Sequence, residues 1–408
     1  VVVNVNPGAT GKVNITVNGK SELVDIVNGR ATLNVAGLAA DKYTVTVSYD
    51  GDGKFTGDNA ETEFTVSPVN PGMSVVVSNI TYGNNATVTV NVNNQATGKV
   101  TITVNGVAHE VDIVNGKASY TVVNPAAGKY TVAVTYDGDA NFTGATINTE
   151  FNVTKADSGM NVIVANITYG NNATVTVTVN NKVTGKVNVT VNGTVYEVDI
   201  VNGKGTLVLS GLAAGDYTVT VDYAGEGNYT DATANAEFTV SKANPGMNVD
   251  VATDDFSGKA NITVTVNDKV TGDVTINVNG TDYTATIVNG KANITVSGLT
   301  EGKYTVTVTY NGDGNFTAAT ATKEFAISTV DPSLNVVVGN ITYGNNATIV
   351  VTADPKATGT VTVTIGTESK TLDLVGGKAT WIVSGLAAGK YDVTVSYSGD
   401  NNFTGTTI

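Results

Sequence analysis

Apolar and polar residues alternate along short segments of this chain, and residues 73–153 show the pattern most clearly. Seven alternating segments follow one another there, at residues 73–78, 86–92, 99–105, 108–113, 117–122, 129–136 and 145–153. Val, Ile, Thr and Tyr carry the alternation, which is typical of half-buried antiparallel strands. No segment has the periodicity of a helix, so the pattern predicts an all-β protein.

The same pattern returns every 87 residues without insertion or deletion. A pair of tyrosines marks each copy: Tyr43 and Tyr49, Tyr130 and Tyr136, Tyr217 and Tyr223, Tyr304 and Tyr310, Tyr391 and Tyr397. A period of this length is too long for a solenoid turn or a propeller blade and suits a small domain. The sequence therefore predicts five tandem domains, at residues 1–69, 70–156, 157–243, 244–330 and 331–408.

Turn residues between the segments indicate the fold of each copy. Asn105-Gly106 and Asn115-Gly116 are predicted two-residue hairpin turns, in which both residues adopt a positive φ. Seven short strands with turns every 8–12 residues or so are typical of an immunoglobulin-like (Ig-like) β-sandwich. The predicted fold class is thus a tandem array of five Ig-like sandwiches.

The first tyrosine of each pair is predicted to form a tyrosine corner, as in immunoglobulin domains, although a plain core aromatic would suit the same position. Two residues later, where those domains have a Cys, this chain has Val45, Val132, Val219, Val306 and Val393. The position of their core Trp is taken by Ile15, Ile102, Val189, Ile276 and Val363. We therefore expect an aliphatic core. Pro125 replaces a Leu of the other copies and predicts a different corner in the second domain.

Short linkers are expected between the domains, at residues 67–72, 156–159, 242–246 and 329–333, and most contain proline. Such joints should be semi-rigid. At a rise of about 3.3 Å per strand residue, each domain should span ~35–45 Å and the array roughly 150–200 Å.

The two terminal copies are expected to be incomplete. Val1 aligns with Val88 and Ile408 with Ile147, so the first copy should lack its first strand and the last copy its last strand. Open strand edges are usually covered. We expect the missing strands to come from neighbouring sequence of the same chain or, alternatively, from another chain.

Composition narrows the class of partner and the compartment. The net charge of −14 disfavours nucleic acid and anionic membranes as partners. No apolar run is long enough to insert into a membrane. The absence of Cys and the surface rich in Thr, Asn and Gly favour an extracellular protein of a prokaryotic cell surface.

No catalytic site is predicted, and no cofactor. The single histidine, His109, is replaced by Glu22, Tyr196, Tyr283 and Lys370 in the other copies, which argues against a catalytic base. An acid recurs in the loop after the second tyrosine, as Asp52, Asp139, Glu226, Asp313 and Asp400. These acids are weak candidates for Ca²⁺ ligands. An ordinary β-turn would account for the same Asp and Gly residues.

The sequence offers candidate residues for two covalent modifications. Self-crosslinking through lysine is disfavoured, because Lys12, Lys99 and Lys186 are replaced by Asp273 and Thr360. N-glycosylation is better supported, by Asn-x-Thr sequons at Asn141, Asn228, Asn315 and Asn402 and then at Asn79, Asn166 and Asn340. A turn Asn beside a strand Thr is the alternative. Trp381, the only tryptophan, is expected in the core rather than on a binding surface.

Several strings resemble a known group of proteins. "NITYGNNATVTV" (residues 79–90 and 166–177), "VDIVNGK" (111–117 and 198–204) and "LAAGKYDVTVSYSGDNNFTG" (386–405) are similar to the bacterial-type Ig-like repeats of adhesin-like surface proteins from methanogenic archaea. The fourth copy departs, with Asp254-Asp255-Phe256-Ser257 in place of "ITYGNN". The resemblance implies a cell-surface stalk or adhesion role and supplies no catalytic residues.

The leading hypothesis is a non-enzymatic, extracellular array, an adhesin stalk that spaces or displays a binding region. The main alternative is a subunit of a surface filament, sheath or surface layer. Direct binding by the repeats and an accessory segment of a secreted hydrolase are further alternatives. The predicted partners are neighbouring Ig-like repeats, in the same or adjacent chains, and a cell-surface or glycan receptor.

Overall fold

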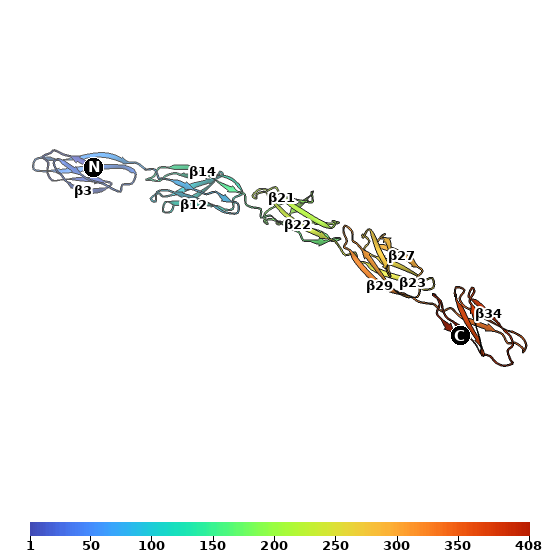
Figure 1. The fold of residues 1–408 in the computed structure, drawn as a ribbon. Helices are drawn as coiled ribbons and strands as arrows, with labels where there is room; N and C mark the ends of the chain where they lie inside the picture. Colours follow the sequence, from blue (N-terminus) through green and yellow to red (C-terminus); the bar gives the residue numbers. More distant parts are fainter.

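Five β-sandwich domains lie end to end in a gently curved row, with the N-terminus in the domain at one end and the C-terminus in the domain at the other (Figure 1). The structure is a computed structural model that describes residues 1–408. We number the domains 1 to 5 along the chain. All regular elements are strands, so the predicted all-β tandem array of Ig-like sandwiches is confirmed. The chain contains no helix that is long and apolar enough to cross a membrane.

Domains 2 and 3 each pair a three-stranded sheet with a five-stranded sheet. In domain 2 the sheets are, in spatial order, β12 (Lys117–Val122), β9 (Ala86–Asn91) and β7 (Ser74–Val76), and β11 (Val107–Asp112), β10 (Lys99–Val104), β13 (Gly128–Tyr136), β14 (Ala145–Thr154) and β8 (Ile80–Thr81). In domain 3 they are β15 (Asn161–Ile163), β17 (Ala173–Thr178) and β20 (Lys204–Leu209), and β16 (Ile167–Thr168), β22 (Ala232–Ser241), β21 (Gly215–Tyr223), β18 (Gly185–Val191) and β19 (Thr194–Ile200).

The other three domains have fewer strands. Domain 1 contains β1 (Val2–Asn4) and β4 (Arg30–Thr32), and β3 (Lys20–Asp25), β2 (Lys12–Val17), β5 (Asp41–Gly51) and β6 (Thr56–Val66). Domain 4 contains β23 (Asn248–Asp254), β24 (Lys259–Thr265) and β27 (Lys291–Ser297), and β26 (Thr281–Thr286), β25 (Asp273–Val278), β28 (Gly302–Tyr310) and β29 (Ala319–Ile327). Domain 5 contains β30 (Asn335–Val338), β31 (Ala347–Thr352) and β34 (Lys378–Val383), and β33 (Glu368–Asp373), β32 (Thr360–Ile365), β35 (Val393–Tyr397) and β36 (Thr406–Thr407).

The alternation of the sequence places one side of each strand in the core. Along β10, Val100, Ile102 and Val104 are buried, whereas Thr101 and Thr103 between them face outwards. All seven strands predicted in domain 2 are present, with ends that differ by at most two residues from the prediction. Each domain has its own hydrophobic core, so each is a separate packing unit.

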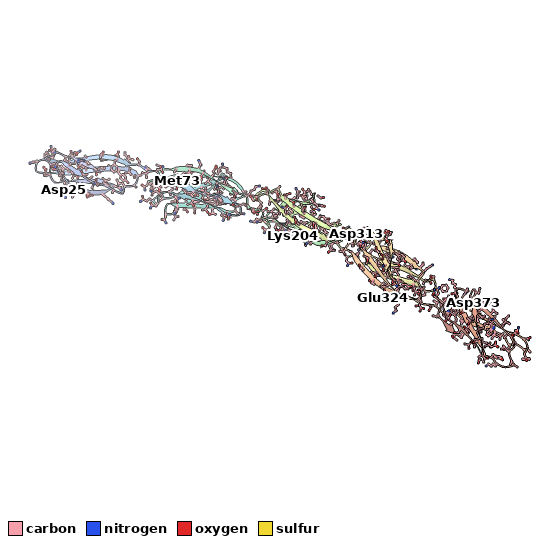
Figure 2. All side chains as sticks on the ribbon, in the orientation of Figure 1. Asp25, Met73, Lys204, Asp313, Glu324 and Asp373 are labelled. Carbon is pink, nitrogen blue, oxygen red and sulfur yellow. The ribbon has the colours of Figure 1, made fainter.

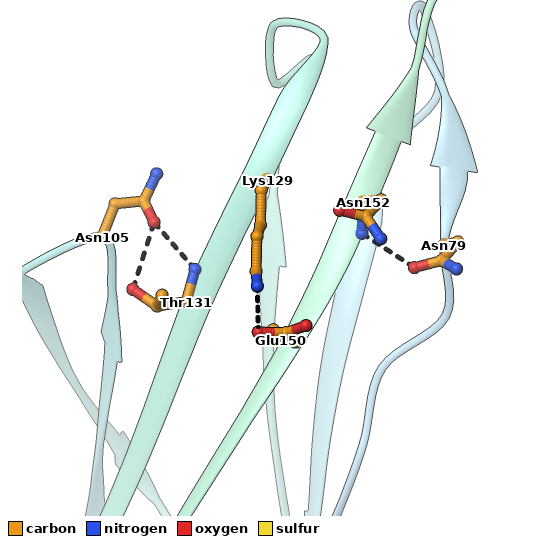
Figure 3. Close-up of polar contacts among 6 residues, drawn as sticks. All are labelled: Asn79, Asn105, Lys129, Thr131, Glu150 and Asn152. Carbon is orange, nitrogen blue, oxygen red and sulfur yellow. Dashed lines mark hydrogen bonds and ion pairs between the residues drawn. The ribbon is translucent and has the colours of Figure 1, made fainter.

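One strand was not predicted. After β7 the chain leaves the first sheet, and β8 adds to the other sheet, parallel to β14. The transfer is held by side chains: Asn152 donates its N–H to Asn79 Oδ1 at 2.7 Å (Figure 3), and the Thr154 hydroxyl contacts Thr81 Oγ1 at 3.2 Å. The second strand of the domain is thereby joined to the last strand.

The predicted turns and corners are confirmed. Asn105 and Gly106 have φ angles of 45° and 85°. In domain 2 the Tyr130 hydroxyl donates to the carbonyl of Ala126 at 3.2 Å, and the same bond four residues upstream is made by Tyr43, Tyr217, Tyr304 and Tyr391. The expectation of a different corner in domain 2 is wrong, because the bond is made to the backbone and does not involve the side chain of Pro125.

The core is aliphatic at the two positions where antibody domains have Cys and Trp. Ile102 and its four counterparts are fully buried, and so are the valines at the Cys position except the half-buried Val393. Trp381 is only 8 % exposed and packs in the core of domain 5, as predicted.

Candidate functional site: the joints between domains

Each linker is fixed to the domain that follows it. One linker residue pairs in parallel with the loop after the second tyrosine, which we call the acidic loop; the pairs are Val69 with Phe142, Ala156 with Tyr229, Ala243 with Phe316, and Val330 with Phe403. At the joint of domains 2 and 3, Ala156 donates to Asn228 O and accepts from Thr230 N, both at 2.9 Å. Between the end of β14 at Thr154 and Ala156, only Lys155 has no backbone pairing with another strand or loop. A linker this short restricts the angles between domains.

An aromatic ring from one domain closes the core of the next. The ring of Tyr82 in domain 2 lies edge-on to Tyr229 in domain 3, with centroids 5.6 Å apart and planes at 79°. Tyr169 with Phe316 and Phe256 with Phe403 repeat this geometry at 5.3 Å and 5.7 Å. Edge-to-face pairs contribute about 0.5–1.5 kcal/mol beyond the area that they bury. The rings therefore couple domains 2 to 5, each to the next.

A carboxamide makes a contact across three of the joints, those between domains 1 and 2, 2 and 3, and 3 and 4. Asn141, Asn228 and Asn315 lie in acidic loops, and each Oδ1 accepts the N–H of a residue just before the tyrosine corner of the preceding domain. The donors are Ala40 at 2.8 Å, Ala127 at 2.7 Å and Ala214 at 2.9 Å. We call this contact the asparagine bridge. It connects backbone to side chain across the domain boundary, so it resists rotation of one domain against the other.

The acids of the acidic loop hold this loop in shape. Asp400 Oδ1 accepts the N–H of Asn402 and of Phe403 at 2.9 Å, and Oδ2 accepts the N–H and hydroxyl of Thr358 at 2.8 and 2.7 Å. Asp52, Asp139 and Asp313 make the matching bonds. Figure 2 shows Asp313 at the end of domain 4 that faces domain 3. These acids position the aromatic residue of the joint.

The bonds change the acidity of these groups. Partial burial disfavours the charged form of Asp400, but the N–H groups of Asn402, Thr358 and Phe403 outweigh it and lower its pKa to about 2. Burial and the neighbouring Asp400 together raise the pKa of Tyr397 to about 12. Glu226 differs, since it contributes its backbone carbonyl, which accepts from Tyr229 N at 3.0 Å.

Calcium binding by these loops stays a prediction. Both carboxylate oxygens of the four aspartates are already used as hydrogen-bond acceptors, which favours a turn-capping role. No cluster of three or more acidic, His or Cys side chains is arranged to hold a metal ion in this chain.

Comparison with known families agrees with this architecture. A family model described as a bacterial Ig-like domain (group 3) matches residues 73–154, 161–241, 248–329 and 334–408. The chain belongs to this family. A search of curated proteins finds no match to this Ig-like array.

Three solved structures of other multidomain proteins are similar to the Ig-like array at low identity. One, described as giving insight into host cell surface retention of a 1.5-MDa bacterial ice-binding adhesin, is 19% identical, with 64% of this chain and 98% of that chain covered and a TM-score of 0.27. Domains A168–A170 of titin are 15% identical (63% and 98% covered, TM-score 0.32), and Sidekick-1 immunoglobulin domains 1–5 are 13% identical (99% and 94% covered, TM-score 0.25).

The sequon asparagines have structural roles in these Ig-like domains that sequence reasoning missed. Besides the three bridges, Asn79 and Asn166 accept the N–H of Asn152 and of Thr239 within their own domains. Asn340 and Asn402 are exposed. All of the cross-boundary and intradomain bonds use the carboxamide oxygen, whereas a glycan would attach to the nitrogen. Glycosylation therefore stays a prediction at all seven positions.

The other candidate residues lie apart from the joints. In domain 2 the ring of His109 stacks on the ring of Tyr120, with the ring centroids 3.9 Å apart. Lys12, Lys99 and Lys186 form exposed ion pairs across a hairpin with Asp25, Glu110 and Glu197. Lys129 pairs with Glu150 at 2.7 Å on the sheet surface (Figure 3). Exposed pairs of this kind contribute little to stability.

Ser158 marks a correctable defect at the joint of domains 2 and 3. Its side chain is fully buried and its hydroxyl has no hydrogen-bond partner. Pro71, Pro245 and Pro332 occupy the same position in other Ig-like domains, and each carbonyl accepts the same backbone bond as Ser158 does.

Replacing Ser158 with Pro should therefore stabilise domain 3, by about 1–2 kcal/mol, because the unpaired hydroxyl is removed and the unfolded chain is restricted. Native-state hydrogen exchange of the whole chain, followed by mass spectrometry, would show slower exchange in β17 and β21. Faster exchange there would mean that the backbone at this position does not suit proline. Ser158→Ala, which removes only the hydroxyl, is the matched comparison.

Proposed function

We propose that the chain is the non-enzymatic, extracellular stalk of a cell-surface adhesin, which holds a binding region away from the cell. The coupling between consecutive domains supports this role most directly. Flexible tandem domains would fold back on one another. Linkers with only one or two unpaired residues, and aromatic contacts at three of the four joints, favour an extended array. We expect a length of roughly 150–200 Å from strand geometry.

Further features are consistent with a surface location. The chain has no Cys and a net charge of −14, so repeats of one molecule and of its neighbours repel each other. The resemblance of its repeated strings to adhesin-like surface proteins of methanogenic archaea supports the same class of function. A receptor would then be bound by a region outside these five domains, with the repeats as spacer.

The spacing role can be tested by surface display. A known binding module is displayed on cells through one, three or all five domains, and capture of its target on an opposing surface is measured. Capture should increase with the number of domains. A Gly/Ser-rich coil with the same number of residues serves as the control and should perform worse, because a flexible chain of that length spans a shorter distance.

Equal capture through the coil would contradict a role that depends on stiffness. The purified segment should also remain monomeric in small-angle scattering. Formation of lateral or end-to-end assemblies would favour the alternative, a subunit of a surface filament, sheath or surface layer.

A further inference from the structure

We propose that the joint between domains 4 and 5 is a hinge, in contrast to the stiff joints between domains 2 and 3 and between domains 3 and 4. This inference deepens the proposed spacing function and rests on it for its biological meaning. Three independent differences between this joint and those two support the inference: the asparagine bridge, the anchoring of the aromatic ring, and the linker.

The asparagine bridge is missing at this joint. Asn402 occupies the position of Asn141, Asn228 and Asn315, but the N–H of Glu301, which corresponds to the donors Ala40, Ala127 and Ala214, makes no bond to it. The loop that should donate has its usual backbone, since Gly302 has a φ of 155° and its counterparts Gly128 and Gly215 have 153°. The difference therefore lies in how domain 5 is placed against domain 4.

The aromatic ring of this joint is held less firmly by its own domain. In domains 2 and 3, Tyr82 and Tyr169 directly follow β8 and β16, and each N–H donates at 2.8 Å to the last residue of the strand that enters the linker. Ring, last strand and linker thus form one hydrogen-bonded unit at these joints.

Domain 4 has no such strand. Its first strand, β23, continues to Asp254 and pairs only with β24, so Phe256 lies in the turn between the two. The nearest bonds of this turn stay within it or reach Leu299. Asp255 Oδ1 is buried there without a partner. Phe256 can therefore move with its turn, independently of β29 and the linker.

The linker also has more freedom here. Ser328 and Thr329 are unpaired between β29 and Val330, whereas a single lysine is unpaired at the joints of domains 2 with 3 and 3 with 4. The joint of domains 1 and 2 has two unpaired residues as well, but one of them is Pro68, whose φ is fixed by its ring.

One contact remains and would act as the pivot. The ring of Phe256 lies edge-on to Phe403, and Lys356 Nζ lies 3.8 Å from the centre of the Phe256 ring on the side of domain 5. The ammonium group of Lys356 is carried on a flexible four-carbon side chain, so it can stay over the ring face when the domains tilt. The two domains can thus tilt while the ring stays covered.

The absence of Cys makes this inference straightforward to test in the whole chain. Lys117, Lys204, Lys291 and Lys378 are exposed and equivalent in domains 2 to 5. Pairs of cysteines at neighbouring members of this set would carry spin labels, and pulsed electron resonance would give the distance distribution across each joint. The distribution between domains 4 and 5 should be clearly broader than those between 2 and 3 and between 3 and 4.

Two matched variants test the cause. Asn228→Ala should broaden the distribution across domains 2 and 3, because it removes an asparagine bridge. Asn402→Ala should leave the distribution across domains 4 and 5 unchanged, because there is no bridge to remove. Broadening by Asn402→Ala, or an unchanged distribution with Asn228→Ala, would overturn the assigned cause.

The outcomes also separate this inference from the proposed function. If all three distributions are equally narrow, the hinge is wrong and the stiff stalk survives. If all three are equally broad, both are wrong, since no joint is then stiff.

Discussion

Replacing Ile102 with Ala should destabilise domain 2 by about 2–5 kcal/mol, the largest effect that we expect from a single substitution. Ile102 is fully buried in β10, between its partner strands β11 and β13, and the smaller side chain would leave a cavity in an aliphatic core. The loss should remain within domain 2, because the five cores are separate.

Hydrogen exchange of the whole chain is the appropriate measurement. Amides of β10 and β13 should lose protection, while those of domains 4 and 5 keep it. Val107→Ala in the same hairpin is the control: Val107 is 60% exposed, and its truncation should change stability by about 0.5 kcal/mol or less. Loss of protection along the entire chain would show that the domains do not fold independently.

Replacing Asp400 with Ala should destabilise domain 5 by about 2 kcal/mol. The substitution removes the acceptor of four hydrogen bonds, and water replaces part of them at this half-exposed site, so the loss is smaller than four full bonds. Trp381 is the only tryptophan and is buried in the same domain, so its fluorescence during urea unfolding reports domain 5 alone. Asp139→Ala, the equivalent change in domain 2, should leave this transition unchanged.

The same carboxyl group makes the stability of domain 5 sensitive to acid. The pKa of Asp400 is lowered to about 2 in the folded domain, below its ordinary value near 4 in the unfolded chain. A lowered pKa stabilises the fold at neutral pH, and the stabilisation is lost as the pH falls from about 4 to about 2. The Trp381 transition should therefore move to lower urea over this range, and Asp400→Ala should flatten the dependence. An equally steep dependence in the variant would assign it to other carboxyl groups.

Local signals explain why the fold of each domain was predictable. Alternation along β10 and the Asn105-Gly106 turn depend on a few adjacent residues. The same pattern occurs in all five copies of the repeat, which made the prediction of strands and turns more secure. The strand β8 was missed because two residues are too few to show alternation, and its partner β14 lies more than 70 residues away in the chain. Only the geometry of the folded domain brings the two together.

The joints were missed for a different reason. Asn228 and Tyr229 belong to an Asn-Tyr-Thr triplet, which is also a glycosylation sequon. The sequence alone therefore suggested a glycan site at Asn228 and not a contact between domains. Their contacts, to Ala127 and Tyr82, cross a domain boundary and depend on the angle between domains, which no local pattern encodes. An aromatic residue recurs at Tyr82, Tyr169 and Phe256, and this recurrence was the available signal. It was hard to detect because the residues around Phe256 differ from those around the two tyrosines.

The parallel pairing of β8 with β14 has a consequence for a chain under tension. These strands lie next to the entry and the exit of domain 2, so a pull on the two ends of the array drags them in opposite directions along their length. Their hydrogen bonds are then loaded together in shear instead of being opened one after another, and the same holds for β16 and β22 in domain 3. In domain 4 the first strand pairs only with its hairpin partner, β24, and can be peeled away bond by bond. Of these three domains, domain 4 should be the first to yield to force, and its unravelling would lengthen the chain while domains 2 and 3 remain folded.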